Sequence, residues 1–390
     1  MQNKKPIIIL FFSVFIDLIG FGMVFPLLPY FAESLGANAF VIGLFIASFS
    51  LMQFIFCPVW GRLSDRFGRR PIILFGLFSS GLTFLIFGWS KTLLMLFISR
   101  ILNGALTAAT LPTAQAYIAD STSNDERTKA YGWLGAAFGL GFIFGPALGG
   151  LLSSDGFALP AYLASGLTFL NFLGALAWLP ETHPKEKRGK LKGKLFDFRD
   201  FYHALRHPSI GSLIIVFALV SFAFSNYYSM LALFSEATVQ IGVRELGFLL
   251  ALTGAFSALI QGVAITAIVR KLGEKRTLVV GLGSMLSGLV LLPFTTTKLL
   301  LTIYSVILTI GFALCNPTVT ALVSKNTKEE EQGVVMGVFQ GSGSLARVMG
   351  PFYGGYVYNT LGRNAPFYGG IVTVVIALVL VIRGVKRNEL

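Results

Sequence analysis

Long apolar runs recur from one end of this chain to the other. Twelve of them have eighteen or more residues with few charges, which is the length an α-helix needs to cross the hydrocarbon core of a bilayer. We expect spans at 6–30, 40–60, 71–90, 92–119, 131–154, 158–180, 209–235, 245–269, 277–295, 299–323, 333–358 and 365–382. In lipid the backbone has no water to bond with, so each run must be helical. The sequence therefore predicts an all-α membrane protein with twelve transmembrane helices.

The basic charge of the chain follows the predicted topology. The chain is 54% hydrophobic and 13% charged, with a formal net charge of +13. Of its 31 Lys and Arg, 25 lie at the N-terminus, in even-numbered connections between spans, or at the C-terminus. This positive-inside bias predicts that both termini lie in the cytoplasm. The charge is thus explained by topology, and we expect no nucleic-acid partner.

The sequence contains no arrangement typical of an enzyme or a metal site. All three histidines fall between the sixth and seventh spans, and Cys57 and Cys315 lie in different spans, where packing explains them. There is no nucleophile–base pair, metal-ligand cluster or phosphate-binding loop. We expect no enzymatic activity, no cofactor and no metal.

The sequence repeats itself at a constant offset of 205 residues. Four separated landmarks share this offset: Gly68 and Gly273, Gly76 and Gly281, Pro112-Thr113 and Pro317-Thr318, and Gly145–Gly150 and Gly350–Gly355. We therefore expect two parallel six-helix bundles, 1–183 and 207–390, joined by a basic cytoplasmic linker at 184–206. Two such repeats around a midplane site are an architecture of alternating-access transporters.

The ten residues Gly61–Arg70 place five charges and two glycines between the runs 40–60 and 71–90. Such a cluster cannot lie in hydrocarbon, so it forms a tight, positively charged cytoplasmic loop between two spans. Gly61 and Gly68 permit close backbone approach and unusual φ angles. The pair of runs is therefore expected to be a transmembrane hairpin.

The charges of this loop suit a conformational latch. Asp65 can accept hydrogen bonds from Arg66, Arg69 or Arg70. At the cytoplasmic rim such a cluster can pair with the opposite half in one conformation and release it in another. The alternative is a turn whose solvated charges only fix topology. The second copy has Arg270 in place of Asp65, so the latch is expected to be one-sided.

Asp17 is the only acidic residue placed well inside a predicted span. A charge at that depth costs about 3 kcal/mol or more unless it is neutralised, paired or hydrated. Burial favours uptake of a proton, which suits a proton-coupling or cation-sensing carboxylate. The alternative is an acid bonded to its own helix. Glycines and prolines follow it and are expected to let the span bend: Gly20, Gly22, Pro26 and Pro29.

Two arginines lie inside apolar runs. Arginine keeps its charge, so Arg100 needs a partner or a hydrated cavity, unless it extends to a membrane face. Arg347 could meet an anionic substrate or a neighbouring carbonyl. These two charges are candidates for the transport site.

Small residues recur three and four positions apart in the segment 139–150. The candidate hinge residues are Gly141, Gly145, Pro146, Gly149 and Gly150. Such spacing allows close helix packing, and a proline introduces a bend. The segment is expected to act as a hinge, the alternative being glycine-rich packing alone.

Polar residues within the spans are candidates for lining a substrate cavity. They are Gln53, Asn103, Gln115, Asn226, Gln261, Asn316 and Arg347. The chain also has 37 Phe, 12 Tyr and 4 Trp. A cavity of rings with scattered amides favours lipophilic or amphipathic solutes.

These motifs resemble those of the major facilitator superfamily of secondary transporters. The resemblance covers nearly the whole chain and is closest to the tetracycline-resistance branch of the twelve-helix drug:proton antiporters. The matching residues are Asp17–Pro29, Gly61–Arg70, Arg100–Gly104, Asp120, Tyr131–Gly135 and Gly145–Gly150.

The resemblance implies roles for several of these residues. The loop at 61–70 would latch the outward-facing state. Arg100 would take part in proton coupling with Asp17 as its partner, because the helices that carry them line the cavity in this family. The motif at 145–150 occurs in the superfamily's antiporters and is generally absent from its symporters.

The chain departs from tetracycline exporters at three places. Those proteins use an acid in the third helix, a histidine in the eighth and an acid in the ninth, where this chain has Thr83, Ser257 and Met285. Export of a magnesium–tetracycline chelate is therefore not expected.

We expect a monomeric antiporter of the bacterial inner membrane that exports a small lipophilic or amphipathic drug or metabolite in exchange for protons. Two alternatives stay open: a proton-coupled importer of a metabolite, and a non-transporting membrane receptor or assembly factor.

Overall fold

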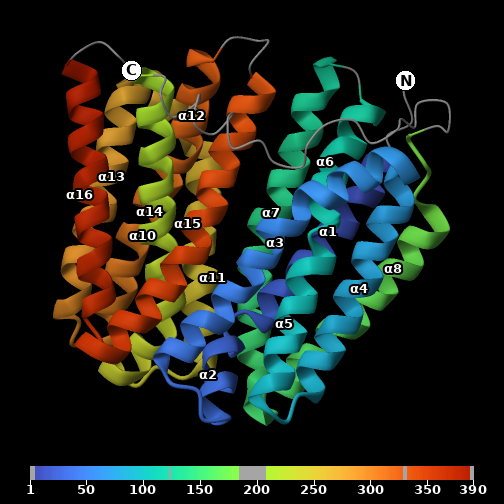
Figure 1. Ribbon diagram of the computed structural model, residues 1–390, viewed down its shortest axis with the longest axis horizontal. Coiled ribbons are helices and arrows are strands. Elements are labelled where there is room, and N and C mark those ends of the chain that lie inside the picture. The colour runs from blue at the N-terminus through green and yellow to red at the C-terminus, as the bar shows by residue number, and fades with distance from the viewer. Residues whose placement is uncertain (1–4, 123, 184–207, 328–331, 387–390) are drawn as a thin grey trace. The chain divides into compact units, whose positions relative to one another are not determined.

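The computed structural model describes residues 5–122, 124–183, 208–327 and 332–386 (Figure 1). Within these ranges the chain is helical and has no strands, as the sequence predicts. The expected linker, 184–206, lies outside the described residues. Eleven helices in the described ranges are long and apolar enough to cross a membrane. The remaining expected span, 333–358, is the helix α15, Gln332–Leu361, which is not among the eleven because polar residues such as Gln340 and Arg347 lower its hydropathy.

The described chain divides into two compact units, and the first consists of Met1–Ala37, Ser48–Leu195 and Val243–Ala255. It contains α1 (Lys5–Val24), α2 (Leu27–Ser34), α4 (Arg69–Trp89), α5 (Leu93–Thr107), α6 (Thr110–Ser121), α7 (Asn124–Leu152), the 3₁₀ turn η1 (Ser153–Asp155) and α8 (Ala158–Trp178). It also contains most of α3 (Ala39–Phe67) and the beginning of α11 (Val243–Leu259). Within this unit α1 packs mainly against α7 and α8, and α4 packs against α8 and α5.

The second unit consists of Asn38–Ala47, Phe196–Gly242 and Phe256–Leu390. Its remaining helices are α10 (Pro208–Val239), the π-helical turn η3 (Ile260–Ala264), α12 (Ile265–Leu272), α13 (Glu274–Leu291), the 3₁₀ turn η4 (Leu292–Phe294), α14 (Lys298–Asn326), α15 and α16 (Ala365–Lys386). Here α10 packs against α15 and α16, and α13 packs against α14. The units differ from the expected halves because the beginning of α3 groups with the second unit and that of α11 with the first. In the second unit, a Cβ placed on Gly43 of α3 would lie 3.0 Å from the Cα of Gly355 in α15.

Prolines explain where two of the expected spans divide into consecutive helices. The first span breaks between α1 and α2 at Pro26, which has no N–H to continue the helix. The fourth span breaks between α5 and α6 at Ala108, because Pro112 cannot donate to that carbonyl. The thiol of Cys57 lies 3.8 Å from the carbonyl oxygen of Ala108 and gives it a weak donor. The half-buried Cys57 therefore donates to the carbonyl left free at the break in the neighbouring span, in addition to packing against that span.

Candidate functional site

Asp17 begins a chain of polar contacts across three helices of the first unit. Its side chain is half-buried on α1, and the hydroxyl of Ser80 on α4 donates a hydrogen bond of 2.7 Å to its Oδ1. Thr83 donates to the carbonyl oxygen of Ser80 at 3.0 Å, and the amide of Asn103 on α5 donates to the hydroxyl of Thr83 at 2.6 Å. A serine hydroxyl can donate to a carboxylate or accept from a protonated acid. Asp17 therefore has a suitable neighbour in either charge state.

Arg100 lies on α5 one turn before Asn103 and is 3% exposed. Its guanidinium carbon lies 4.3 Å from the ring centroid of Phe49 and 5.9 Å from that of Phe21. Within the ranges that the structure describes, the guanidinium makes no hydrogen bond or ion pair, and its Nε is buried. The aromatic rings are therefore the groups that contact this charge, through cation–π interactions.

The ion pair expected between Asp17 and Arg100 is not formed in the described structure. Ser80 bonds to the acid instead, and the guanidinium lies over the ring of Phe49. Arg100 also does not extend to a membrane face, because its side chain is enclosed among the helices of the first unit.

Aromatic side chains surround this buried charge. Phe21, one helical turn after Asp17, has its ring centroid 5.5 Å from that of Phe49, 5.9 Å from Phe25 and 6.3 Å from Phe142. These rings come from α1 and the residue that follows it, from α3 and from α7. One unit thus brings together an acid, a buried guanidinium and several apolar rings.

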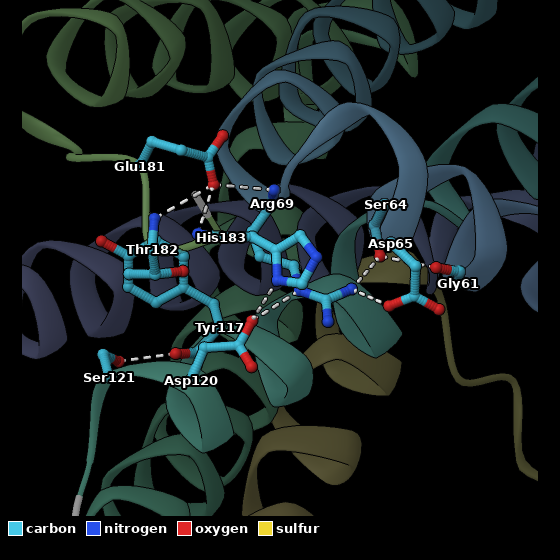
Figure 2. Close-up of polar contacts among 10 residues, drawn as sticks. All are labelled: Gly61, Ser64, Asp65, Arg69, Tyr117, Asp120, Ser121, Glu181, Thr182 and His183. Atoms are coloured by element: carbon cyan, nitrogen blue, oxygen red, sulfur yellow. Dashed lines mark hydrogen bonds and ion pairs between the residues drawn. The ribbon is translucent and has the colours of Figure 1, made fainter. Parts of the chain in front are cut away.

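A second polar cluster lies where α3 meets α4 (Figure 2). Gly68 joins the two helices with φ of 104°, a value that glycine adopts without strain. Arg69 follows and donates from Nη1 to Asp65 at 2.5 Å and to Ser64 at 2.7 Å. Its Nε donates to Asp120 at the end of α6 at 2.8 Å. One arginine, 8% exposed, thereby connects the ends of α3, α4 and α6.

The segment that follows α8 joins this cluster, and sequence reasoning missed it. Oε1 of Glu181 accepts hydrogen bonds from the backbone N–H groups of Arg69 at 2.9 Å and of Thr182 and His183 at 3.0 Å. Nδ1 of His183 lies 3.5 Å from Asp120 Oδ2. Glu181 therefore satisfies a donor at the N-terminus of α4, where Gly68 has no side chain to do so.

Two further bonds hold this segment in place. The hydroxyl of Tyr117 on α6 donates to the carbonyl oxygen of Pro180 at 3.0 Å. Nη2 of Arg70 donates to the carbonyl oxygen of Leu176 at 2.6 Å. The end of α8, where Leu176 lies, and the segment that follows it are thus attached to both α4 and α6.

The other expected latch residues have less specific surroundings. Gly61 lies inside α3 with open space where a Cβ would be. Arg66 is exposed, with its guanidinium carbon 5.3 Å from the ring centroid of Phe67. Of the three arginines considered for Asp65, Arg69 is the one that the structure pairs with it.

The glycines of the expected hinge bring α7 into backbone contact with α1. A Cβ on Gly145 would lie 2.7 Å from the Cα of Gly22, and one on Gly141 would lie 2.6 Å from the Cβ of Leu18. Gly149 faces the backbone of Met23 in the same way. The three glycines are four residues apart and so form one face of α7, which is continuous through Pro146. Gly150 faces α11 instead, where its Cβ would lie 3.1 Å from the Cα of Gly247.

The expected cavity residues are divided between the two units. Gln53, Asn103 and Gln115 are in the first unit, and Asn226, Gln261, Asn316 and Arg347 are in the second. Asn226 is buried and donates to the carbonyl oxygen of Pro366 at 2.6 Å, which ties α10 to α16. Gln261 is exposed in the π-helical turn η3 and donates to Ser257 at 2.7 Å. Arg347 is exposed and donates to Ser344 at 2.8 Å.

The sequence matches the family model of the Major Facilitator Superfamily over residues 10–351, and again over 217–389. The chain belongs to the major facilitator superfamily. Membrane transport, and not enzymatic catalysis, is therefore the activity of this major facilitator, as the sequence predicts.

Relatives and solved structures agree with this assignment. The protein is 29% identical to Multidrug resistance protein 2 of Bacillus subtilis (strain 168) over 100% of this chain and 97% of the relative. It is 31% identical to the class B Tetracycline resistance protein of Escherichia coli over 92% and 89% of the two chains. The solved peptide transporter POT in complex with sulfate has the same fold, with a TM-score of 0.82, 16% identity and coverage of 98% and 94%. The human organic anion transporter MFSD10 gives a TM-score of 0.72 at 24% identity, with coverage of 97% and 99%.

Proposed function

We propose that this major facilitator is a proton-coupled antiporter. It exports a small lipophilic or amphipathic drug or metabolite across the bacterial inner membrane, with both termini in the cytoplasm. Relatives named for multidrug and tetracycline resistance support export of a drug-like compound. The distribution of Lys and Arg supports the orientation.

The observation that carries the proposal is the environment of Asp17. The acid is half-buried deep in a spanning helix and bonds to Ser80, and the buried Arg100 on α5 has no acidic partner among the described residues. With Asp17 ionised, the two side chains together carry no net charge. With Asp17 protonated, they carry one positive charge. Binding of a proton and binding of a cationic solute therefore oppose each other electrostatically, which is the requirement for exchange.

Two other parts of the first unit complete the proposed cycle. The segment Gly61–Arg70, which comprises the end of α3, Gly68 and the start of α4, serves as the latch, with the bonds of Arg69 formed in one state and exchanged in another. The face Gly141, Gly145 and Gly149, with Pro146 and Gly150, serves as the hinge that seals α7 against its neighbours. The close contacts of these glycines support a role in which α1 and α7 move together without opening a leak between them.

Tetracycline is not the proposed substrate. Thr83 is occupied in the polar chain from Asp17, Ser257 accepts a bond from Gln261, and Met285 is fully buried. None of these three side chains can supply the negative charge or imidazole that the tetracycline exporters use at these places.

The test uses purified protein in proteoliposomes with an imposed pH gradient. A toxicity screen of a pump-deficient strain that expresses the protein first identifies a transported compound. The gradient should then drive flux of that compound, and Asp17→Asn should abolish the coupling while the thermal unfolding transition is retained. Glu33→Gln, at an exposed acid at the end of α2, is the control and should couple normally. Coupling that survives in the Asp17→Asn variant would sink the proposed role.

A further inference from the structure

The second half of the chain repeats the ion pair between Arg69 and Asp120 with its charges exchanged. In the second unit, Nζ of Lys325 at the end of α14 donates to Oε1 of Glu274 at the start of α13, at 2.5 Å. The sequence offset of 205 residues that relates the two halves takes Arg69 to Glu274 and Asp120 to Lys325. The same two positions therefore form an ion pair in each half, with the opposite polarity.

The loop glycine and a third charge follow the same relation. Gly273 joins α12 to α13 with φ of 77°, as Gly68 joins α3 to α4. Arg270 stands one helical turn before Glu274, where the first half has Asp65 one turn before Arg69. Three interacting charges of the first half are thus all reversed in the second.

The reversal is confined to the two positions of the ion pair and to Arg270, one turn before Glu274. Two neighbouring positions keep their positive charge in both halves, with Arg66 matching Lys271 and Arg70 matching Lys275. Reversing one member of an ion pair alone would place like charges together. Joint reversal keeps the attraction, so the pattern indicates that these positions act as a set.

The helix dipoles explain why the two halves differ in one further contact. Glu274 at the N-terminus of α13 and Lys325 in the last turn of α14 both have the charge that the helix ends favour. Arg69 at the N-terminus of α4 and Asp120 in the last turn of α6 have the opposite charges. In the first half Glu181 supplies the negative charge at the N-terminus of α4, next to Arg69. In the second half Glu274 provides it directly.

We propose that Glu274 and Lys325 are positioning residues of the transport cycle. They form a charge-exchanged counterpart of Arg69 and Asp120 that fixes the N-terminus of α13 to the end of α14. The proposal requires only that the protein transports a solute, and it is independent of proton coupling at Asp17.

The exposure of the pair favours a role in positioning over one in stability. The side chain of Lys325 is 66% exposed and that of Glu274 is 20% exposed. Ion pairs at such positions contribute little to the free energy of unfolding. Variants at these residues are therefore expected to fold, and their effect should appear in the order of the helix end and in the rate of transport.

The test is a charge exchange in the full-length protein in lipid nanodiscs. Glu274→Lys and Lys325→Glu each place like charges together, and the double variant restores the attraction in the polarity of the first half. Amide hydrogen exchange at 274–280 should accelerate about tenfold in each single variant and return close to the original rate in the double variant. Lys271→Glu is the matched control, since it changes the charge by the same amount at an exposed position three residues before Glu274. It should leave the exchange rate at 274–280 unchanged.

Transport gives a second readout with ethidium, a lipophilic cation, as the probe. Exchange of ethidium across proteoliposomes without a pH gradient needs no proton coupling, so its result is separate from that of Asp17→Asn. Each single variant should lower the maximal rate with little change in KM, and the double variant should recover it. If a reversed charge prevents folding, Glu274→Gln and Lys325→Gln remove the attraction without repulsion and serve in its place. A double variant whose helix end exchanges as fast as in the singles, or a Lys271→Glu variant equally affected, overturns the proposal.

Discussion

The hydroxyl of Ser80 donates to the carboxyl of Asp17 at 2.7 Å and so links α4 to the one acid placed well inside a predicted span. The bond fixes the acid on the side of α1 that faces α4. A hydrogen bond to an ionised group is worth about 1.5–3 kcal/mol, enough to decide the orientation of the side chain.

Removal of the Ser80 hydroxyl should therefore weaken coupling without unfolding the protein. We expect Ser80→Ala to lower proton-driven flux about tenfold, the equivalent of a hydrogen bond of about 1.5 kcal/mol to the acid. Ser80→Thr keeps a hydroxyl at the same position and should retain most of the flux. Equal flux in the two variants would show that the bond has no part in coupling.

The ring of Phe49 should stabilise the charge of Arg100. Phe49→Leu is expected to lower the free energy of unfolding by about 2 kcal/mol, from lost burial together with the lost cation–π interaction. In an Arg100→Met background the same substitution should cost about 1 kcal/mol less, since only the burial is then lost. Thermal unfolding of the four proteins in one detergent measures the difference. Identical costs in both backgrounds would mean that the ring and the charge do not interact.

Gly145 should tolerate no side chain. A Cβ there would lie 2.7 Å from the Cα of Gly22, and backbone atoms cannot move aside as a flexible side chain can. Gly145→Ala is expected to lower stability by about 1–3 kcal/mol through forced separation of α1 and α7. Gly135 lies on the same helix with open space where its Cβ would be, so Gly135→Ala should be neutral or raise stability by about 0.5–1 kcal/mol. The two midpoints of thermal unfolding should therefore move in different directions.

Loss of the Glu181 carboxylate should loosen the N-terminus of α4. Because it satisfies the N–H of Arg69 from outside the helix, Glu181→Ala is expected to cost about 1 kcal/mol, as for other helix caps. Glu181→Gln keeps an acceptor oxygen but loses the charge, so its cost should be intermediate. Amide hydrogen exchange at 69–73 measures the effect, and Glu33→Gln again provides the control. Unchanged exchange in the alanine variant would contradict the capping role.

Expression of the protein should not protect cells against tetracycline. Thr83, Ser257 and Met285 cannot replace the acids and the histidine of tetracycline exporters. In a pump-deficient strain the minimum inhibitory concentration of tetracycline should stay unchanged while that of at least one lipophilic compound rises. A rise for tetracycline would show that a different set of side chains recognises it.

The helical framework was predictable because hydrocarbon imposes a simple rule on length and polarity. The runs 40–60 and 71–90 could only be spans, and the charges between them could only lie outside the bilayer. The expected loop is not formed, because α3 continues through these charges to Phe67 and Gly68 alone separates it from α4. The same rule placed a span at 333–358 although glutamines, serines and an arginine lower its hydropathy, and the chain there is helical from Gln332 to Leu361.

The contacts of the candidate site were harder to predict because they depend on how each helix is rotated. The sequence placed Asp17 and Arg100 in the membrane. Only the packing of α4 against α1 determines that Ser80 meets the acid, and only that of α5 against α3 determines that Phe49 meets the guanidinium. Glu181 had no local pattern, since a single acid after a helix resembles any solvated residue. The opposite charges at the matching positions Arg69 and Glu274 were visible in the sequence repeat. Only the structure shows that each of them forms an ion pair with its own partner.

The contact between Gly22 and Gly145 has a mechanical consequence. Two helices whose backbones touch cannot slide or tilt independently without colliding, so α1 and α7 must move as one rigid body at that level. Asp17 lies little more than one turn before Gly22. Any tilt that a change of charge at Asp17 imposes on α1 is therefore passed to α7 directly, with no soft side chains in between to absorb it.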